Sequence, residues 1–137
     1  MIQSLGMEFD FMINNDLVSI VVEEISRKGD ILVVGGVSHK VIEVNSFVNL
    51  DVLALRKKYS TDITFFKRQG DCVFAKTFEA GGEKFTSSCG TGAIAASLSA
   101  GVSKIFMPGG LLKVEKVDRG VMLTGKVVKE GIFCYGN

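Results

Sequence analysis

The chain has 137 residues, of which 47% are hydrophobic and 23% are charged, and its formal net charge at pH 7 is +1. That length predicts one domain that buries about two-thirds of the surface of its unfolded chain. Since acidic and basic residues are mixed, the charge gives no support to binding of nucleic acid or of an anionic membrane. The longest strongly apolar runs, residues 18–22 and 31–37, are far shorter than a membrane-spanning helix.

Neither the first residues nor the cysteines indicate secretion. Residues 1–3 lack the basic and apolar segments of a signal peptide. Cys72, Cys89 and Cys134 are odd in number and widely spaced, without a C-x-x-C motif, and the chain has one histidine. A disulfide framework and a metal site are therefore not expected, and a reducing cytoplasm is the expected compartment.

Short strands separated by turns are predicted over most of the chain. In chain order, the expected strands are residues 5–14, 17–26, 31–35, 41–44, 63–67, 72–78, 105–107, 111–117, 121–124 and 126–133. A break is expected at residues 36–39, a tight turn at residues 108–110, and a hairpin between the strands at 63–67 and 72–78, around Gly70. No linker, low-complexity tract or clear repeat divides the sequence.

Two helices are predicted. Asn49 is expected to cap the first, over residues 50–59, with its apolar side chains inward and its basic ones in solvent. The inward set is Val52, Leu53 and Leu55, and the outward set is Arg56, Lys57 and Lys58. The second lies in an uncharged stretch, where residues 92–100 are only Gly, Ala, Ser, Ile and Leu before Gly101. A helix that is apolar on all sides is expected to be buried, and many strands around it predict an α+β domain.

Cys89 comes just before the second helix, beside Gly90 and Gly92, which let other atoms approach the backbone closely. At a helix N-terminus, unpaired amides and the helix dipole favour an anion and lower the pKa of a thiol. A reactive cysteine is one interpretation. A buried cysteine in a turn before a tightly packed helix, with Ser88 or Thr91 as the N-cap, is the other.

The run from Phe78 to Gly92, with Glu79, two glycines and S-C-G-T-G before an alanine-rich helix, resembles the second signature of the diaminopimelate epimerase family. The similarity continues at residues 107–111, 123–125 and 132–133, and residues 36–39 stand where the family has G-N-P-H. It covers roughly residues 30–137, and only C-G-T-G and P-G-G-x-L are strongly specific. Proline racemases, which also carry C-G-T-G, match less well.

This resemblance implies a diaminopimelate-epimerase-like α+β fold, an antiparallel barrel-like sheet wrapped around one buried central helix. Residues 1–137 would form a single domain similar to the second half of a two-domain amino-acid epimerase. It implies that Cys89 is catalytic and exchanges the Cα proton of an amino acid, without pyridoxal phosphate, metal or other cofactor. The substrate-binding positions that it implies are Ser88, Gly90, Thr91, Gly92, Glu79, Asp62, Ser38 and His39.

The departures from the family decide what else is expected. Its first half, with a second catalytic cysteine, is absent, and Cys72 and Cys134 are expected to be core cysteines. The second acid or base would then come from the mate in a homodimer or from a complementary half-domain.

The substrate contacts also differ. Ala80 replaces the arginine that grips a distal carboxylate, and the spacing from Glu79 to Cys89 is one residue longer. Diaminopimelate is therefore not the expected substrate. A neutral or cationic amino acid, with Asp62 or Glu79 at its positive end, fits better, although both carboxylates also suit ordinary strand ends. His39 is expected to fix a loop rather than to act as a base.

The sequence thus predicts a cofactor-independent isomerase, an amino-acid racemase or epimerase unit. Its alternative is a non-catalytic domain that binds an amino acid or carboxylate, or regulates another protein, and retains the epimerase fold. A third possibility is that the chain is one portion of a longer natural protein.

Overall fold

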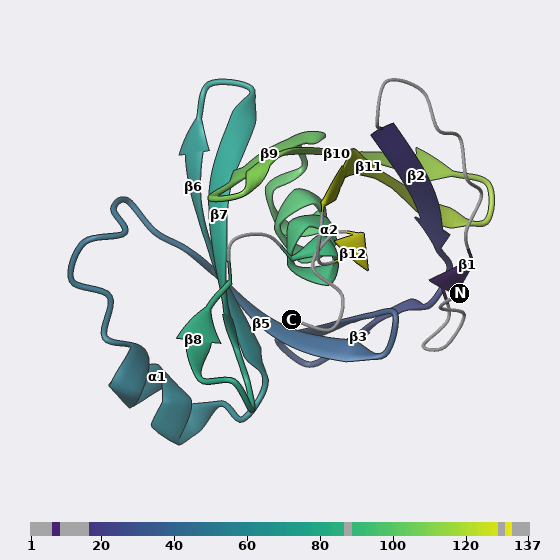
Figure 1. The fold of residues 1–137 in the computed structure, drawn as a ribbon. Helices are drawn as coiled ribbons and strands as arrows, with labels where there is room; N and C mark the ends of the chain where they lie inside the picture. Colours follow the sequence, from purple (N-terminus) through teal and green to yellow (C-terminus); the bar gives the residue numbers. More distant parts are fainter. Residues whose placement is uncertain (1–6, 9–16, 87–88, 129–130, 133–137) are drawn as a thin grey trace.

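The computed structural model describes residues 7–8, 17–86, 89–128 and 131–132. In this part of the chain a strongly curved sheet wraps around helix α2, Gly90–Ala100, while helix α1, Val52–Lys58, lies to one side (Figure 1). The strands are β1 Met7–Glu8, β2 Leu17–Val22, β3 Ile25–Lys28, β4 Ile31–Val34, β5 Val37–Glu43, β6 Asp62–Gln69, β7 Cys72–Glu79, β8 Lys84–Phe85, β9 Lys104–Met107, β10 Gly110–Val117, β11 Gly120–Val128 and β12 Gly131–Ile132. The expected α+β class, with a barrel-like sheet around a buried helix, is confirmed.

The described strands pair in the order β1-β2-β11-β10-β9-β7-β6-β5-β4-β3, with β12 on β11 and β8 on β7. All of these pairs are antiparallel except β5–β6 and β7–β9. Parallel neighbours need a crossover connection, and the two helices supply it. α1 lies between β5 and β6, and α2 lies between β7 and β9, which carries α2 into the interior of the curved sheet.

The sheet is nearly closed because two ends of its strand order are joined by a short link. Strands β2 and β3 lie near opposite ends of the order, yet only Glu23 and Glu24 separate them in the chain. Since each residue spans at most about 3.6 Å, the two ends must curve toward one another. The predicted single strand over residues 17–26 is therefore wrong, because this segment contains β2 and the start of β3. The short link between these two strands brings the ends of the sheet together.

Helix α2 fills the space inside the sheet. Ala93, Ile94, Ala95 and Ala96 are 0% exposed, and the helix contacts seven strands, β4, β5, β6, β7, β9, β10 and β11. Its small side chains let these strands approach on every side, as predicted for an uncharged helix. Gly101 ends the helix with a φ of 74°, in the left-handed conformation that glycine adopts without strain.

The predicted break at residues 36–39 is wrong. Gly35 and Gly36 have φ values of 57° and 84° and form a two-residue turn, so that Val34 pairs with Val37. Such a turn needs positive φ at both central residues and matches the twist of the strands that flank it. Strand β5 therefore begins at Val37, and His39 lies inside a strand rather than in a loop.

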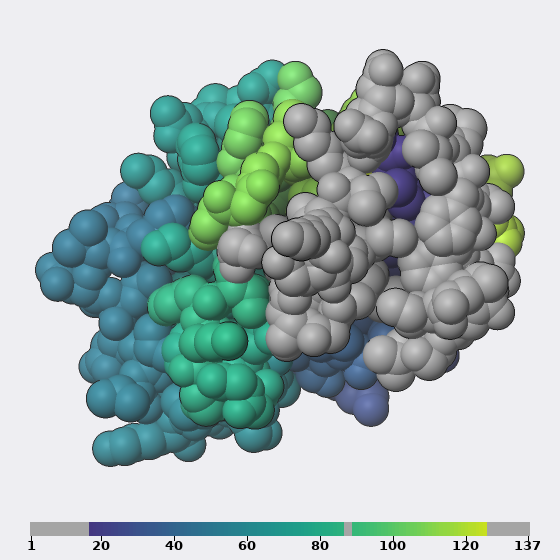
Figure 2. All heavy atoms as spheres, viewed as in Figure 1, coloured from purple at the N-terminus to yellow at the C-terminus, as the bar shows by residue number. Residues whose placement is uncertain are grey.

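The first helix also differs from its prediction. Asp51, not Asn49, is the N-cap, and its Oδ1 accepts a hydrogen bond from the Ala54 amide at 3.1 Å. None of the residues of α1 is buried, and Leu53 is 79% exposed. The helix and the loop before it form the blue projection at one edge of the molecule (Figure 2). The helical period correctly predicts a helix in this segment. It does not show whether a sheet face is available to cover the apolar side of that helix.

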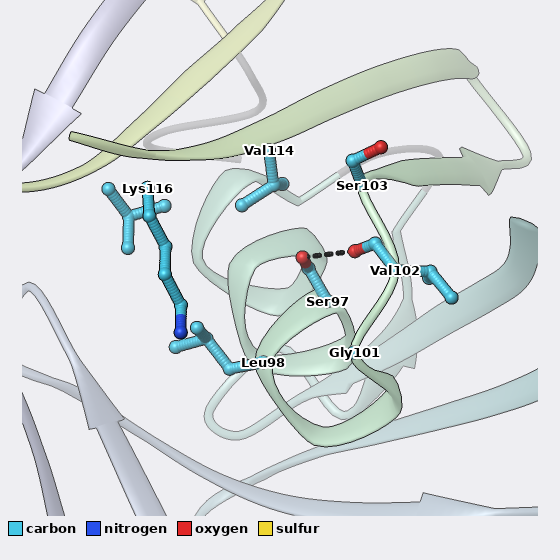
Figure 3. A pocket seen from close by; sticks show the side chains of 8 residues that line it. Ser97, Leu98, Gly101, Val102, Ser103, Val114 and Lys116 are labelled. Atoms are coloured by element: carbon cyan, nitrogen blue, oxygen red, sulfur yellow. Dashed lines mark hydrogen bonds between the residues drawn. The ribbon is translucent and has the colours of Figure 1, made fainter.

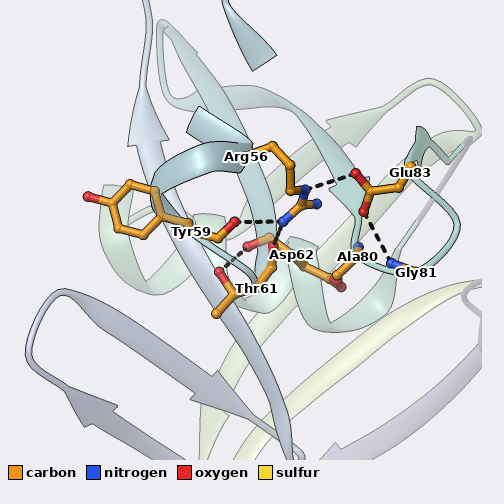
Figure 4. A network of polar contacts seen from close by, with 7 residues as sticks. All are labelled: Arg56, Tyr59, Thr61, Asp62, Ala80, Gly81 and Glu83. Carbon is orange, nitrogen blue, oxygen red and sulfur yellow. Dashed lines mark hydrogen bonds and ion pairs between the residues drawn. The ribbon is translucent and has the colours of Figure 1, made fainter. Parts of the chain in front are cut away.

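Arg56, expected in solvent, instead holds α1 against the sheet (Figure 4). Its Nη1 donates to the carbonyls of Tyr59 and Thr61 at 2.8 and 2.7 Å, and its Nε donates to Glu83 Oε1 at 3.0 Å. The guanidinium also lies 5.3 Å from the centre of the Phe78 ring. One side chain thus connects α1, the start of β6 and the turn after β7.

Replacing Arg56 with alanine is expected to lower the free energy of unfolding by about 1–3 kcal/mol, because several hydrogen bonds from a charged group are lost. Urea unfolding measures that change, and amide hydrogen exchange should show faster opening of α1. Lys57→Ala, on the exposed side of the same helix, is the matched control. Equal effects of the two substitutions would contradict the anchoring role of Arg56.

Candidate active site

Cys89 is the N-cap residue of α2, a position that the sequence assigned to Ser88 or Thr91. Its backbone is extended, with φ −150° and ψ 114°, and its Sγ accepts a hydrogen bond from the Gly92 amide at 3.4 Å. Thr91 lies inside the first turn, and Ser88 is outside the described residues. Serine and threonine oxygens are the usual caps, so the sequence placed Cys89 at the start of the helix without identifying it as the N-cap.

The Cys89 side chain lies in the apolar core with one hydroxyl group beside its sulfur. The residue is 6% exposed and packs in the core, and its amide donates to Met107 Sδ at 3.4 Å. Its Sγ is also 3.6 Å from Thr91 Oγ1. The thiol therefore lies at the positive end of an interior helix, with a backbone amide and a hydroxyl in contact with the sulfur.

His39 joins this group from strand β5. It is 0% exposed, and its Nε2 and Nδ1 are hydrogen-bonded to Thr91 Oγ1 and Thr64 Oγ1, both at 2.9 Å. Thr64 is in turn hydrogen-bonded to Thr77 at 2.9 Å. Burial lowers the pKa of His39 to about 4, so the imidazole is neutral at pH 7. A neutral ring bonded on both sides suits a positioning role rather than that of an ion-pair partner for a thiolate.

Gly92 lets the helix end approach these threonines. A Cβ on Gly92 would overlap Thr77 Oγ1 and would lie 3.3 Å from both Cys89 Sγ and Thr64 Oγ1. No residue other than glycine fits this position without a shift of its neighbours. The second glycine of the C-G-T-G motif thus has a packing reason that the sequence alone suggested only in general terms.

Thr64 and Thr77 were not predicted as site residues. They are 0% exposed and face one another across the β6–β7 hairpin, in the register that its turn dictates. A signal was present, because this hairpin was predicted around Gly70 and its register alone places Thr64 opposite Thr77. What the sequence did not show is that this face of the hairpin meets the start of α2.

Asp62 and Glu79 form a second group at the ends of the same two strands. The register that pairs Ile63 with Phe78 places them opposite one another, two positions beyond Thr64 and Thr77. Burial raises the pKa of Asp62, whose Oδ1 accepts a hydrogen bond from the Ala80 amide at 2.8 Å. Burial, with the neighbouring Asp62, also raises the pKa of Glu79. Both carboxylates are half-buried.

Two further predicted positions lie apart from the thiol. Ser38 pairs with Val33 and precedes His39 in a strand, so its side chain points to the opposite face of the sheet. Cys72, expected in the core, is half-buried at the β6–β7 turn, where its Sγ donates to the Gln69 carbonyl at 3.2 Å. Cys134 lies outside the described residues.

A cavity of about 270 Å³ lies at the other end of α2 (Figure 3). Its lining is apolar apart from two serines and Lys116, which projects along one wall. The lining residues are Ser97, Leu98, Gly101, Val102, Ser103, Val114, Lys116 and Val121. This hollow is separated from Cys89 by the length of the helix, so it is not part of the candidate site.

Among the described residues, no histidine, cysteine, aspartate and glutamate side chains gather in a group of three or more able to hold a metal ion. Within the same part of the chain, neither helix is long and apolar enough to cross a membrane.

Two curated proteins are similar to this chain, and both are diaminopimelate epimerases. The relative from Archaeoglobus fulgidus is 33% identical over 105 residues, which cover 66% of this chain and 37% of that protein. The relative from Thermotoga maritima is 33% identical over 105 residues, covering 69% of this chain and 44% of that protein. The match thus spans less than half of either relative. No family model matches the chain.

Proposed function

Because the chain is related to the diaminopimelate epimerases over about two-thirds of its length, we propose that it is an amino-acid epimerase or racemase unit. In this proposal Cys89 exchanges the Cα proton. The observation that supports it best is the position of the sulfur at the N-terminus of buried helix α2, in contact with the Gly92 amide and the Thr91 hydroxyl. An amide and a hydroxyl in contact with the sulfur are groups that can donate hydrogen bonds to a thiolate, the form in which cysteine acts as a base.

The reaction needs a base on one face of Cα and an acid on the other. The Cys89 thiolate would take the Cα proton and become a thiol, while the second group would deliver a proton to the opposite face. Negative charge moves onto the substrate carboxylate as the proton leaves, and the amides of the first turn of α2 would stabilise it. The Cys89 thiolate would act as the base, and the helix amides would stabilise the charge on the substrate carboxylate. The proposal therefore includes no cofactor.

The second acid or base is proposed to lie outside this part of the chain. The match covers less than half of each relative, so more than half of each relative's length lies outside it. A second copy of this chain, with its own Cys89 opposite the first, would complete the site symmetrically. A separate polypeptide that carries a complementary half would do the same.

The charges near the site support a neutral or cationic amino acid as the substrate. Ala80 offers no guanidinium to a distal carboxylate, and Arg56 beside this turn is already bonded to Glu83 and to two carbonyls (Figure 4). Asp62 and Glu79 instead place two carboxylates at the strand ends. These would attract the amine of a substrate and repel a second carboxylate.

The experiment is incubation of the protein in D₂O with each common amino acid, both enantiomers, and diaminopimelate, followed by mass spectrometry. Deuterium is expected at Cα of a neutral or cationic amino acid. A rate per chain that rises with protein concentration identifies a second copy as the source of the other acid. Absence of exchange with every amino acid, at all concentrations and with a co-purifying partner present, would overturn the proposal. Thermal stabilisation by an amino acid without exchange would support the binding-domain alternative, which the burial of Cys89 favours.

A further inference from the structure

Thr86, the residue that follows strand β8, has a buried hydroxyl group without a hydrogen-bond partner. The residue is 6% exposed, and its Oγ1 forms no hydrogen bond with any described residue. The one other such atom in the described part of the chain, Arg56 Nη2, belongs to a guanidinium that makes three hydrogen bonds through its other nitrogens. A buried hydroxyl without a partner destabilises the folded protein, because it loses hydrogen bonds to water and gains none. Native structures contain few such groups, and each calls for an explanation.

The pairing of β8 with β7 shows which way this side chain points. Phe85 pairs with Phe78. The Thr86 amide donates to the Thr77 carbonyl at 3.1 Å, which continues the pairing by one residue. Directly opposed residues on paired strands project to the same face of a sheet. The Thr77 side chain faces the start of α2, because its Oγ1 would overlap a Cβ on Gly92, so Thr86 points to the same end of the helix.

The other buried threonines at this end of the helix all have partners. Thr64 is hydrogen-bonded to Thr77 at 2.9 Å. Thr91 is hydrogen-bonded to the His39 imidazole, also at 2.9 Å. The protein thus satisfies these hydroxyl groups from within, and the hydroxyl of Thr86 differs from them in having no partner.

Two backbone amides at the start of α2 are also unpaired. The third and fourth amides of the helix both donate to Cys89, to its Sγ at 3.4 Å and to its carbonyl at 2.8 Å. This leaves the amides of Gly90 and Thr91 without a hydrogen bond to any described residue. Free N–H groups at a helix N-terminus bind anions, and the helix dipole adds to the attraction. The Thr86 hydroxyl therefore points to the end of the helix that favours a negatively charged ligand.

We propose that Thr86 is a substrate-binding residue, whose hydroxyl donates a hydrogen bond to the carboxylate of a bound amino acid. The inference rests on the proposed function, in which the amides at the start of α2 bind that carboxylate. A hydroxyl can donate or accept, and the positive end of the helix favours an acceptor that carries negative charge. The amine is expected at the strand ends, beside Asp62 and Glu79. Thr86 thus gains its partner when the carboxylate binds.

The stability of the free protein distinguishes an unpaired hydroxyl from a paired one. Thr86→Val replaces the hydroxyl by a methyl group of similar size, so it should raise the midpoint of urea unfolding or leave it unchanged. Thr124→Val is the matched control and should lower the midpoint, because Thr124 is hydrogen-bonded to Ser19 at 2.8 Å. A midpoint lowered in Thr86→Val as in Thr124→Val would show that Oγ1 is already paired in the free protein, for example with an ordered water, and would overturn the proposal.

The second test is ligand binding, followed through the amide signals of Gly90 and Thr91 in ¹⁵N NMR spectra at constant ionic strength. The probes are glycine, the smallest amino acid, and acetate, which carries the carboxylate without the amine. Both are expected to bind the parent. Thr86→Val is expected to weaken each by about 10- to 100-fold, the usual effect of losing a hydrogen bond to a charged group. Thr86→Ser keeps the hydroxyl and should bind more tightly than Thr86→Val, while Thr124→Val should bind like the parent.

The inference is overturned if neither probe binds the parent, or if folded Thr86→Val binds both as tightly as the parent does. It is also overturned by a loss confined to one probe, since a contact to the carboxylate is shared by both. Neither test measures proton exchange. If exchange proceeds while Thr86→Val binds like the parent, the inference falls and the proposed function stands. If exchange fails while binding depends on Thr86, the inference stands and the catalytic part of the proposed function falls.

Discussion

Gly92→Ala is expected to lower the free energy of unfolding by about 1–3 kcal/mol, although alanine usually stabilises a helix by about 1 kcal/mol relative to glycine. The reason is steric. The new methyl group would overlap Thr77 Oγ1 and press on Cys89 Sγ and Thr64 Oγ1, each 3.3 Å away. Thr77 has little freedom to move, because it is buried in a central strand and hydrogen-bonded to Thr64. Urea unfolding at constant pH measures the change.

Two variants make this expectation specific. A methyl group on Gly82 would come no closer than 3.9 Å to its neighbours, so Gly82→Ala should change stability by less than about 0.5 kcal/mol. Thr77→Ala removes the oxygen that the new methyl group meets. In a double-mutant cycle, Gly92→Ala should therefore cost less in the Thr77→Ala background than alone. A Gly92→Ala protein as stable as Gly82→Ala would contradict the close packing of the helix end.

Lowering the pH from 7 to 4 is expected to remove about 3 kcal/mol of stability through His39 alone. Its pKa is about 4 in the folded protein and 6.5 for the unperturbed side chain. Between these values the unfolded chain binds a proton at this histidine and the folded chain does not, so stability rises with pH and falls as the solution is acidified. The effect is present in full above about pH 6.5 and is lost progressively down to pH 4.

Asp62 and Glu79 act in the opposite direction. Their folded pKa values are raised, so the folded protein takes up their protons before the unfolded chain does, and acidification through those values favours folding. The His39→Gln variant isolates the histidine contribution, since glutamine does not titrate. Urea unfolding at several pH values should show a steeper loss for the parent than for the variant. Parallel loss in the two proteins would rule out the buried neutral imidazole.

Local sequence patterns were sufficient to predict the elements whose burial or pairing follows from their own residues. Helix α2 has no charged residue and no polar face, so burial is the only arrangement that it allows, and Gly101 marks its end. The β6–β7 hairpin follows from two apolar runs around Gly70, which has a φ of 64°. Both were predicted because the residues that determine them are local in the sequence.

The predictions that were wrong depend on contacts outside the segment from which each was made. Helix α1 has an amphipathic sequence, but no sheet face receives Leu53, and Arg56 finds its carbonyl partners beyond the helix end. The Gly35–Gly36 pair is compatible with either a break or a hairpin turn, and pairing with β4 selects the turn. A sequence pattern shows which face of a segment is apolar. Whether another element packs against that face depends on the rest of the fold.

The candidate site divides in the same way. Cys89, Thr91 and Gly92 are contiguous, so a short motif was enough to predict them together. His39 reaches Thr91 across 52 positions and Thr64 across 25, and only the folded sheet brings these groups to one place. His39 was predicted near the site, but as part of a loop, and its two hydrogen bonds depend on strand β5.

The most direct test of the account is the rate of solvent-deuterium incorporation at Cα of the best amino-acid substrate, measured for the parent, Cys89→Ser and Cys72→Ser. Serine is itself a good N-cap, so Cys89→Ser should keep the start of α2 while removing the base. We expect exchange by Cys89→Ser to fall by about 10²–10⁴, the usual contribution of a general base, and Cys72→Ser to retain the parental rate. Folded Cys89→Ser that exchanges deuterium as fast as the parent would contradict the central claim.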